Sequence, residues 1–196
     1  MSGERLRLFL AVEIPDDARE LLSVTIDGLR EAMPGTRWVK AKNLHLTLKF
    51  IGDYGEEGLK RLSNEIRATA ERCQGFRAVL GGCGAFPSQR KARVVWVGMS
   101  EGADEAGKIA RKLDARLEKA GVKREGRPFS GHLTMARLKQ PKDFSPQLEE
   151  MSGRLEGLRS MPFEVGEIVL YRSILSPQGP TYVALERAGL GGERIE

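Results

Sequence analysis

The sequence predicts a fold of mixed helices and strands built from two similar halves. Segments with strand-like alternation and segments with helical periodicity follow one another along the chain. The only two histidines open two copies of the triplet His-Leu-Thr, at residues 45–47 and 132–134. The offset between the copies, 132 minus 45 or 87 residues, also aligns other elements of the same type. We therefore expect residues 1–196 to form a single domain of two interleaved, pseudo-symmetric lobes.

The first half begins with a strand and a helix. LRLFLAVEI (6–14) is apolar and rich in strand-forming residues, and Pro15 separates it from residues 16–33. This second segment has acids in its first turn and one apolar helical stripe, formed by Leu22, Ile26, Leu29 and Met33. Another amphipathic helix is expected over residues 56–73, and a strand over 76–86.

The segment between these two helices, NLHLTLKFIG (43–52), is typical of a strand with strict alternation. One face would hold Leu44, Leu46, Leu48 and Phe50, and the other His45, Thr47, Lys49 and Ile51. The first triplet should therefore present its histidine and threonine side by side, while its leucine is anchored in the core.

The second half repeats this order. A basic loop joins the strand at 76–86 to the next strand, and the helix that follows is expected to stop at Gly121. The expected elements are strand 92–99, helix 103–121, strand 130–138 with the second triplet, a less regular helix near 145–158, and strands 162–175 and 179–187.

The 87-residue offset supports a repeated architecture. It aligns Phe9 with Trp96 and Phe76 with Phe163 in the sequence, and it also aligns the first strands and first helices of the two halves. Identity outside the triplets is slight, so the repeat is one of structure more than of sequence. A pseudo-two-fold axis between the halves would bring the two triplets face to face across a cleft.

Composition and charge limit the classes of function. With 40% hydrophobic and 30% charged residues and no apolar run of membrane-spanning length, the chain is typical of a globular protein that does not enter a membrane. Two cysteines are too few for a disulfide framework and indicate reduced thiols in the cytoplasm.

The net charge of +5 favours a polyanionic partner. The excess of cations is strongest in SQRKAR (88–93) and in GVKREGRPFSGH (121–132), just ahead of the second triplet. Solvated loops are the alternative interpretation of both runs.

The two triplets suit acid–base chemistry at a phosphate. Imidazole titrates near neutral pH, so one histidine can accept a proton while the other donates one. Threonine hydroxyls, helped by nearby cations, can bind the non-bridging oxygens of a phosphate. Histidines on opposite sides of a phosphorus atom suit an in-line displacement, in which one activates the incoming oxygen and the other protonates the leaving oxygen.

Other interpretations fit less well. A single histidine is often structural, but two in the same triplet on matching strands favour a shared function. A catalytic zinc ion usually needs three protein ligands, and a serine triad would need a nucleophile motif that the sequence lacks. We therefore expect no metal and no cofactor.

The paired H-L-T-L and H-L-T-M strands resemble the two H-x-T-x motifs of the 2H phosphoesterase superfamily. Further segments look like its RNA 2′,3′-cyclic phosphodiesterase branch, also known as the 2′-5′ RNA ligase (ThpR/LigT-like) family. They are RLFLAVEIP (7–15), RVVWVGM (93–99), RPFSGHLTMAR (127–137), and YRSIL and GPTY near the C-terminus. The resemblance covers nearly the whole chain. It implies a bilobed α+β fold with two antiparallel sheets flanked by helices and a central cleft.

The resemblance also implies roles for individual residues. His45 and His132 match the catalytic histidines, with His45 as the expected proton donor and His132 as the expected acceptor, and Thr47 and Thr134 match the phosphate-binding threonines. Arg137 matches a basic residue after the second motif, but strict alternation would turn it away from His132 unless the strand ends or bulges there. On the first strand, Phe9 is a candidate for contact with a base or ribose, with a core position as the alternative.

The function implied is the metal-independent hydrolysis of 2′,3′-cyclic phosphates to 2′-phosphates. The substrates would be RNA ends, with tRNA fragments as one candidate, or cyclic nucleotides. Two alternatives stay open. The physiological reaction could be 2′-5′ ligation or cleavage of a 2′-5′ phosphodiester, or the chain could be an RNA-binding module without catalysis. A monomer is the expected oligomeric state.

Overall fold

The computed structural model describes residues 4–191, and these contain four α-helices and nine strands. The helices are α1 (Asp16–Arg30), α2 (Leu59–Ala70), α3 (Ala103–Leu117) and α4 (Ser145–Arg154). The strands are β1 (Arg5–Val12), β2 (Arg37–Trp38), β3 (Leu46–Gly55), β4 (Phe76–Phe86), β5 (Ala92–Glu101), β6 (His132–Lys142), β7 (Phe163–Val165), β8 (Glu167–Ile174) and β9 (Thr181–Gly189).

The strands form one antiparallel sheet of nine strands. A single residue pair joins its two parts, which we call the two sheets. The order of the strands is β7-β4-β5-β6-β3-β1-β8-β9, and β2 pairs with β6 beside this path. The junction between β3 and β6 is a single pair, Leu46 opposite Leu133. The predicted α+β fold is therefore confirmed, but the two expected sheets are parts of one continuous sheet, which join at the leucines of the two triplets.

The two halves of the chain exchange elements across this junction. An offset of 87 residues aligns β1 with β5, β3 with β6, and β4 with the segment that holds β7 and β8. Strand β4 comes from the first half but pairs with β5 of the second, whereas β8 comes from the second half and pairs with β1 of the first. Each sheet thus contains strands from both halves.

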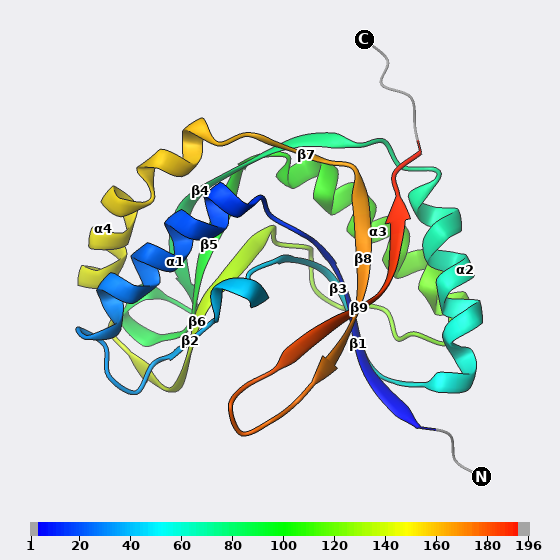
Figure 1. Cartoon of the computed structure of the whole chain (residues 1–196), viewed down its shortest axis with the longest axis horizontal. Coiled ribbons are helices and arrows are strands. Elements are labelled where there is room, and N and C mark those ends of the chain that lie inside the picture. Colours follow the sequence, from blue (N-terminus) through cyan, green and yellow to red (C-terminus); the bar gives the residue numbers. More distant parts are fainter. Residues whose placement is uncertain (1–3, 192–196) are drawn as a thin grey trace.

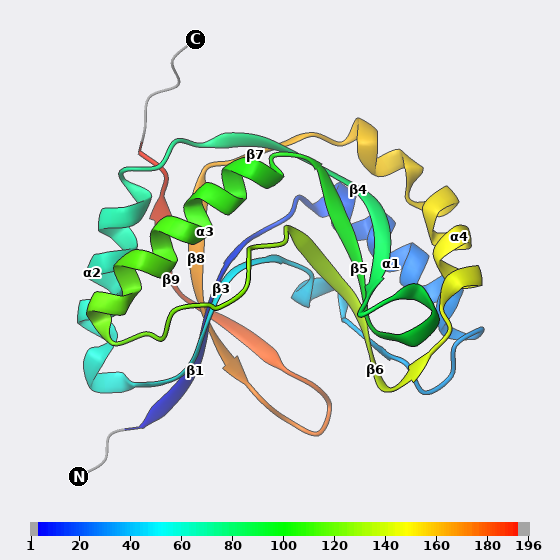
Figure 2. The ribbon, with the colours of Figure 1, turned by 180° about the vertical axis from the view of Figure 1, so that it is seen from behind.

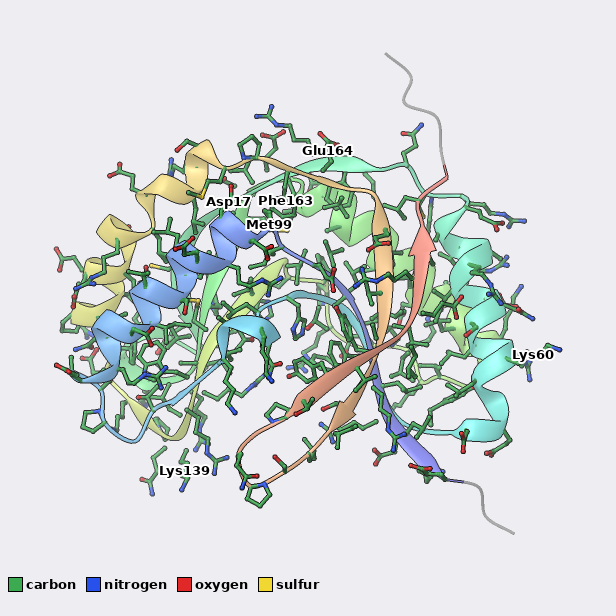
Figure 3. The ribbon with its side chains drawn as sticks, viewed as in Figure 1. Asp17, Lys60, Met99, Lys139, Phe163 and Glu164 are labelled. Atoms are coloured by element: carbon green, nitrogen blue, oxygen red, sulfur yellow. The ribbon has the colours of Figure 1, made fainter. Side chains whose placement is uncertain are left out.

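The helices cover the sheets in two separate cores. One apolar cluster joins α2 and α3 to β1 and β8, and the other joins α1 and α4 to β5 and β6. Figures 1 and 2 show these helix pairs at opposite ends of the molecule, with the strands between them. Met99 and Phe163 pack against both clusters, and Figure 3 shows them between the two ends. The faces of the sheets that carry no helix are left for the site.

Several element boundaries differ from the sequence-based expectation. The predicted helix 16–33 ends at Arg30, and the predicted strand 162–175 is two strands separated by Gly166. The helix expected to stop at Gly121 ends in a short 3₁₀ turn, where Gly121 has φ +81°, a left-handed conformation that favours glycine. These shifts leave the order of elements unchanged.

Candidate active site

The two His-Leu-Thr triplets meet at the junction of the sheets. Leu46 and Leu133 pair across it and are buried in different apolar clusters. Neighbouring side chains of a strand point to opposite faces, so the histidines and threonines lie on the face opposite the leucines. In this antiparallel register the histidine of each triplet stands across from the threonine of the other.

His45 lies just before β3, and both of its ring nitrogens have hydrogen-bond partners. Its Nδ1 is 2.7 Å from the carbonyl oxygen of Asn43, and its Nε2 is 3.0 Å from Oγ1 of Thr47. A carbonyl oxygen can only accept, so Nδ1 carries the hydrogen. In the neutral ring Nε2 then accepts from the hydroxyl of Thr47 and is the nitrogen that can take up a proton.

The turn before His45 is fixed by two side chains. The amide of Asn43, which is buried, donates to the carbonyl of Pro180 at 2.8 Å. From α1, Arg19 donates to the carbonyls of Ala41 and Leu44, both at 3.0 Å. These contacts set the position of the carbonyl that orients the imidazole.

His132 opens β6 and repeats this arrangement. Its Nδ1 is 2.8 Å from the carbonyl oxygen of Ser130, two residues earlier, just as His45 binds the carbonyl two residues before it. The same argument places the hydrogen on Nδ1 and leaves Nε2 for proton exchange. The local pseudo-symmetry therefore extends to the tautomer of the two rings.

Both histidines have a pKa below the usual 6.5. Burial disfavours the imidazolium form and is the largest cause in each case, while the carbonyl bound at Nδ1 acts in the opposite direction. The positive charge of Arg137 lowers the pKa of both rings, and Arg19 adds to this effect at His45. One guanidinium thus acts on both halves of the site.

Arg137 owes this position to an irregularity in β6. Between β5 and β6, Val95 faces Ala136 and Trp96 faces Thr134, so Met135 is left without a partner. Met135 and Ala136 are both fully buried, and alternation resumes with Arg137 exposed. This shift supplies the bulge that the sequence-based prediction required for Arg137 to share a face with His132.

The same irregularity in β3 corrects the predicted alternation of the first triplet strand. Leu48 has no partner in β1, Lys49 is 5% exposed and Phe50 is 56% exposed, so the prediction for residues 49 and 50 was wrong. Phe50 occupies the place that Arg137 has in the second half, because both lie three residues beyond the threonine.

Phe9 supports the site from β1 and does not line an open surface. Only 3% of it is exposed, and its ring centroid lies 4.9 Å from that of His45. Tyr171 stacks on it at 5.3 Å and Tyr182 contacts it edge-on at 4.8 Å. In this structure Phe9 packs against the imidazole and has little surface for a base, as its alternative core position implied.

Sequence reasoning did not select several aromatic residues that the fold brings to the histidines. Tyr182 lies edge-on to His45, with centroids 5.3 Å apart, and Phe86 lies edge-on to His132 at 5.1 Å. Trp96, expected in the core, is half-buried and its centroid lies 6.4 Å from that of His132. The alignment of Trp96 with Phe9 was the one signal that could have placed it here.

A cavity of about 230 Å³ adjoins His45. It is lined by Glu13, Arg19, Lys42, Leu44, His45, Tyr171, Tyr182 and Ala184. In its wall, Glu13 accepts hydrogen bonds from Tyr171 and Arg187. The hydrogen bond with Arg187 lowers the pKa of the Glu13 carboxyl. The cavity therefore has aromatic and cationic walls beside one of the two imidazoles.

Within residues 4–191, no group of three or more His, Cys, Asp or Glu side chains could hold a metal ion. No helix in the same part of the chain is long and apolar enough to cross a membrane.

The fold brings the two His-Leu-Thr triplets of the duplicated chain to one junction, and comparisons with known proteins give the family. The model of the LigT-like phosphoesterases matches the chain twice, over residues 12–96 and 97–182, so that each match contains one His-Leu-Thr triplet. The chain belongs to the LigT-like phosphoesterase family.

Individual relatives agree with this assignment. The RNA 2′,3′-cyclic phosphodiesterase of Methanothermobacter thermautotrophicus is 37% identical over 182 residues, which cover 93% of this chain and 97% of that protein. The enzyme of the same name from Archaeoglobus fulgidus is 34% identical over 177 residues, which cover 90% of this chain and 96% of that protein.

Solved structures show the same fold. The crystal structure of TT0787 of Thermus thermophilus is 29% identical with a TM-score of 0.77, over 96% of this chain and all of that one. E. coli LigT complexed with 3′-AMP is 28% identical with a TM-score of 0.70, also over 96% of this chain and all of that one.

Proposed function

We propose that this protein hydrolyses 2′,3′-cyclic phosphates at RNA ends to 2′-phosphates, by acid–base catalysis with His45 and His132 and without a metal ion. The observation that carries the proposal is the single Leu46–Leu133 pair, which brings both triplets to one junction. The names of the relatives described above support the reaction and the RNA substrate.

In the proposed reaction, Nε2 of His132 removes a proton from water as the water oxygen bonds to phosphorus. The bond between phosphorus and O3′ breaks on the opposite side, and Nε2 of His45 delivers its proton to O3′. The product has a 2′-phosphate and a 3′-hydroxyl, and the two imidazoles return to their starting states by exchange with solvent. Each imidazole should contribute about 10²- to 10⁴-fold in rate.

The cavity beside His45 supports this assignment of roles. The nucleoside of a cyclic phosphate remains attached to the leaving oxygen, so it must lie on the side of the proton donor. The aromatic and cationic cavity adjoins His45, whereas His132 is not part of its lining. His45 is therefore the donor in the proposal, and His132 faces the attacking oxygen.

Three further side chains are assigned to the phosphate. The hydroxyls of Thr47 and Thr134 lie on the face of the histidines and can donate to the non-bridging oxygens. Arg137 shares this face and its charge acts on both rings, so a phosphate between the rings would be within its influence. Binding a dianionic transition state at this place is the role that we give to these three residues.

The proposal also covers location and assembly. The protein would act as a monomer in the cytoplasm on RNA fragments with cyclic ends, tRNA fragments among them. Within the described residues Cys73 and Cys83 are free thiols, which supports a reducing compartment.

The experiment is the incubation of the protein with 2′,3′-cyclic AMP in excess EDTA, with separation of the products. The proposal predicts 2′-AMP as the product and a rate unchanged by EDTA. Formation of 3′-AMP would contradict the assigned leaving group, and loss of activity that a divalent ion restores would contradict metal independence.

A further inference from the structure

The carbonyl that orients His132 lies in a segment that is held by few hydrogen bonds. Residues 123–130 lead from the end of α3 to β6, and all of them except Phe129 are exposed. Figure 2 shows this segment running back from the end of α3 toward the centre of the molecule. Among the described residues, no backbone hydrogen bond ties residues 126–130 to the rest of the fold. The position of the Ser130 carbonyl therefore has to come from another contact.

The contacts that hold the equivalent carbonyl in the first half have no counterpart here. There, Asn43 and Arg19 fix the turn before His45 by hydrogen bonds. The offset of 87 residues places Ser130 at the position of Asn43 and Ala106 at that of Arg19. The hydroxyl of Ser130 has no hydrogen-bond partner in the part of the chain that the structure describes, and an alanine side chain has no donor. The two carbonyls are consequently positioned by different means.

Phe129 provides an apolar anchor next to Ser130. Its half-buried ring packs against the apolar cluster that joins α2 and α3 to β1 and β8. A Cβ at Gly107 in α3 would lie 3.4 Å from Cδ1 of Phe129, so the ring occupies the space that this helical glycine leaves open. The residue at the position of Gly107 in the first half, 107 minus 87, is Glu20. The notch for the ring therefore belongs to the second half alone.

On the other side of Ser130, the backbone lies close to Met99. A Cβ at Gly131 would be 3.0 Å from Sδ of Met99 and 3.5 Å from Cε1 of Phe129. The absence of a side chain at Gly131 thus lets the chain approach both residues closely. Met99 packs against both apolar clusters, so it is a well-supported surface for this backbone. The residues on both sides of Ser130 are in contact with the core, although Ser130 itself is exposed.

From these observations we infer that Phe129 is a positioning residue for His132. Its ring, seated on α3 at Gly107, fixes the carbonyl oxygen of Ser130, which lies 2.8 Å from Nδ1 of the imidazole. An imidazole without a carbonyl partner can carry its hydrogen on either nitrogen, and only the form with Nε2 unprotonated can accept a proton there. The effect of Phe129 on catalysis rests on the proposed function, whereas its effect on the tautomer of His132 does not.

The first test measures the tautomers of the two histidines, which are the only ones in the chain. Imidazole ¹⁵N NMR distinguishes the two neutral tautomers, and a His45→Gln sample assigns the signals. In Phe129→Ala we expect His132 to become a mixture of both tautomers, because its carbonyl partner is no longer held in place. His45 should keep its hydrogen on Nδ1 in the same sample, and it serves as the internal control.

The second test measures the hydrolysis of 2′,3′-cyclic AMP and separates kcat from KM. Phe129→Ala should lower kcat by about 10- to 100-fold and change KM by less than about threefold, because a misplaced base loses rate while the other contacts to the substrate remain. Phe129→Leu keeps an apolar side chain in the notch and should recover most of the lost rate. This rescue by a conservative replacement is expected of an anchor and requires no aromatic ring.

Two controls separate positioning from a general loss of stability. Leu59 is also a partly buried residue that packs against the same cluster, but it lies at the start of α2. Leu59→Ala and Phe129→Ala should both lower the urea midpoint of unfolding, while only Phe129→Ala should change the tautomer of His132 and kcat.

Gly107→Leu leaves Phe129 unchanged but fills its notch, so it should repeat the effects of Phe129→Ala. Gly107→Ala should not repeat them, because the added methyl group lies at an ordinary contact distance of 3.4 Å from the ring. If Phe129→Ala does not fold, this pair of variants provides the same comparison.

Three outcomes overturn the inference. They are a His132 tautomer that neither Phe129→Ala nor Gly107→Leu alters, an equal change at His45, and a loss of kcat no larger than that of Leu59→Ala. A different result would count against the proposed function alone. It is a protein that does not hydrolyse the cyclic phosphate but in which Phe129→Ala still changes the tautomer of His132 and not that of His45, and it would leave the role of Phe129 supported.

Discussion

At the scale of single residues, the site depends on two imidazoles that are held in the same way. Each ring gives its Nδ1 hydrogen to a backbone carbonyl two residues earlier, which leaves Nε2 for the proposed proton transfers. A residue that acts on both rings is Arg137, whose charge lowers the pKa of each. The pH dependence of the reaction therefore reports on this arrangement directly.

We predict a bell-shaped dependence of kcat/KM on pH with its maximum below pH 6.5. The free enzyme needs one neutral and one protonated histidine, and both pKa values lie below 6.5 because burial disfavours the charged form. Above both pKa values the proton donor is lost, and below both the acceptor is lost. A maximum above pH 7.5 for 2′,3′-cyclic AMP would contradict the lowered pKa values.

Replacing Arg137 by Gln should move this bell to higher pH and reduce kcat/KM by about 10- to 100-fold. The shift follows because a cation that lowers both pKa values is removed. The loss follows because the charged contact that we propose between Arg137 and the phosphate is removed. Lys139→Gln is the matched control, since Lys139 lies two residues further along β6, extending from its outer end in Figure 3. A profile that stays in place in Arg137→Gln would remove Arg137 from the site.

At the scale of elements, the two bulged strands decide which side chains reach the site. Leu48 in β3 and Met135 in β6 each lack a partner in the adjacent strand, and each reverses the alternation that follows. The first bulge turns Lys49 inward. There its ammonium pairs with Asp114 at 2.7 Å and donates to the carbonyl of Lys123 at 2.9 Å. The strand of the first triplet thereby holds the segment that leads to the second.

Lys49→Met should lower the free energy of unfolding by about 3 kcal/mol and reduce kcat with a smaller change in KM. The protein loses stability because the carboxylate of Asp114, which is largely buried, loses its closest cation. The loss in kcat comes from the freed segment before His132, whose position sets the Nδ1 contact of that ring. Urea unfolding and steady-state kinetics measure the two effects.

Lys60→Met is the control for this substitution, because Lys60 is exposed on α2, where Figure 3 shows it pointing outward. An equal loss of stability in both variants would contradict the role of the buried ion pair. A Lys49→Met variant with unchanged kcat would show that the segment before His132 is held by other contacts.

The elements themselves could be predicted from periodicity, but the bulges could not. The stripe of α1 and the alternation of residues 44–47 are local patterns, and both are present as expected. Lys49 is buried and Phe50 is exposed because the register with β1 slips, and this slip depends on a partner strand that is distant in sequence. The local sequence offers no reason to bury a lysine and expose a phenylalanine.

At the scale of the whole molecule, the duplicated chain is folded so that its halves exchange strands and helices. Helix α1 follows β1 in sequence but packs with α4 against β5 and β6. Helix α3 follows β5 in sequence but packs with α2 against β1 and β8. The offset between the triplets predicted the duplication and the meeting of the two triplets. It could not predict the exchange, because the pairing partners of β4 and β8 are set by tertiary packing and not by local pattern.

This exchange predicts that residues 1–196 unfold as a single cooperative unit. Neither sheet can keep its helices if the other half of the chain is lost, and Met99 and Phe163 join the two cores. Thermal unfolding should show one transition, with equal calorimetric and van't Hoff enthalpies. Two separate transitions, or a stable fragment after proteolysis between residues 102 and 130, would contradict a single domain.

The most direct test of the account is a comparison of two substrates with the two histidine variants. In a 2′,3′-cyclic nucleotide whose 3′-oxygen is replaced by sulfur, the leaving group departs as a thiolate and needs no proton. We predict that His45→Ala loses about 10²- to 10⁴-fold in kcat with the oxygen substrate but about tenfold or less with the sulfur substrate, whereas His132→Ala loses activity with both. Equal losses of His45→Ala on the two substrates, or full activity of either variant on the oxygen substrate, would contradict the placement of the two imidazoles on opposite sides of one phosphorus atom.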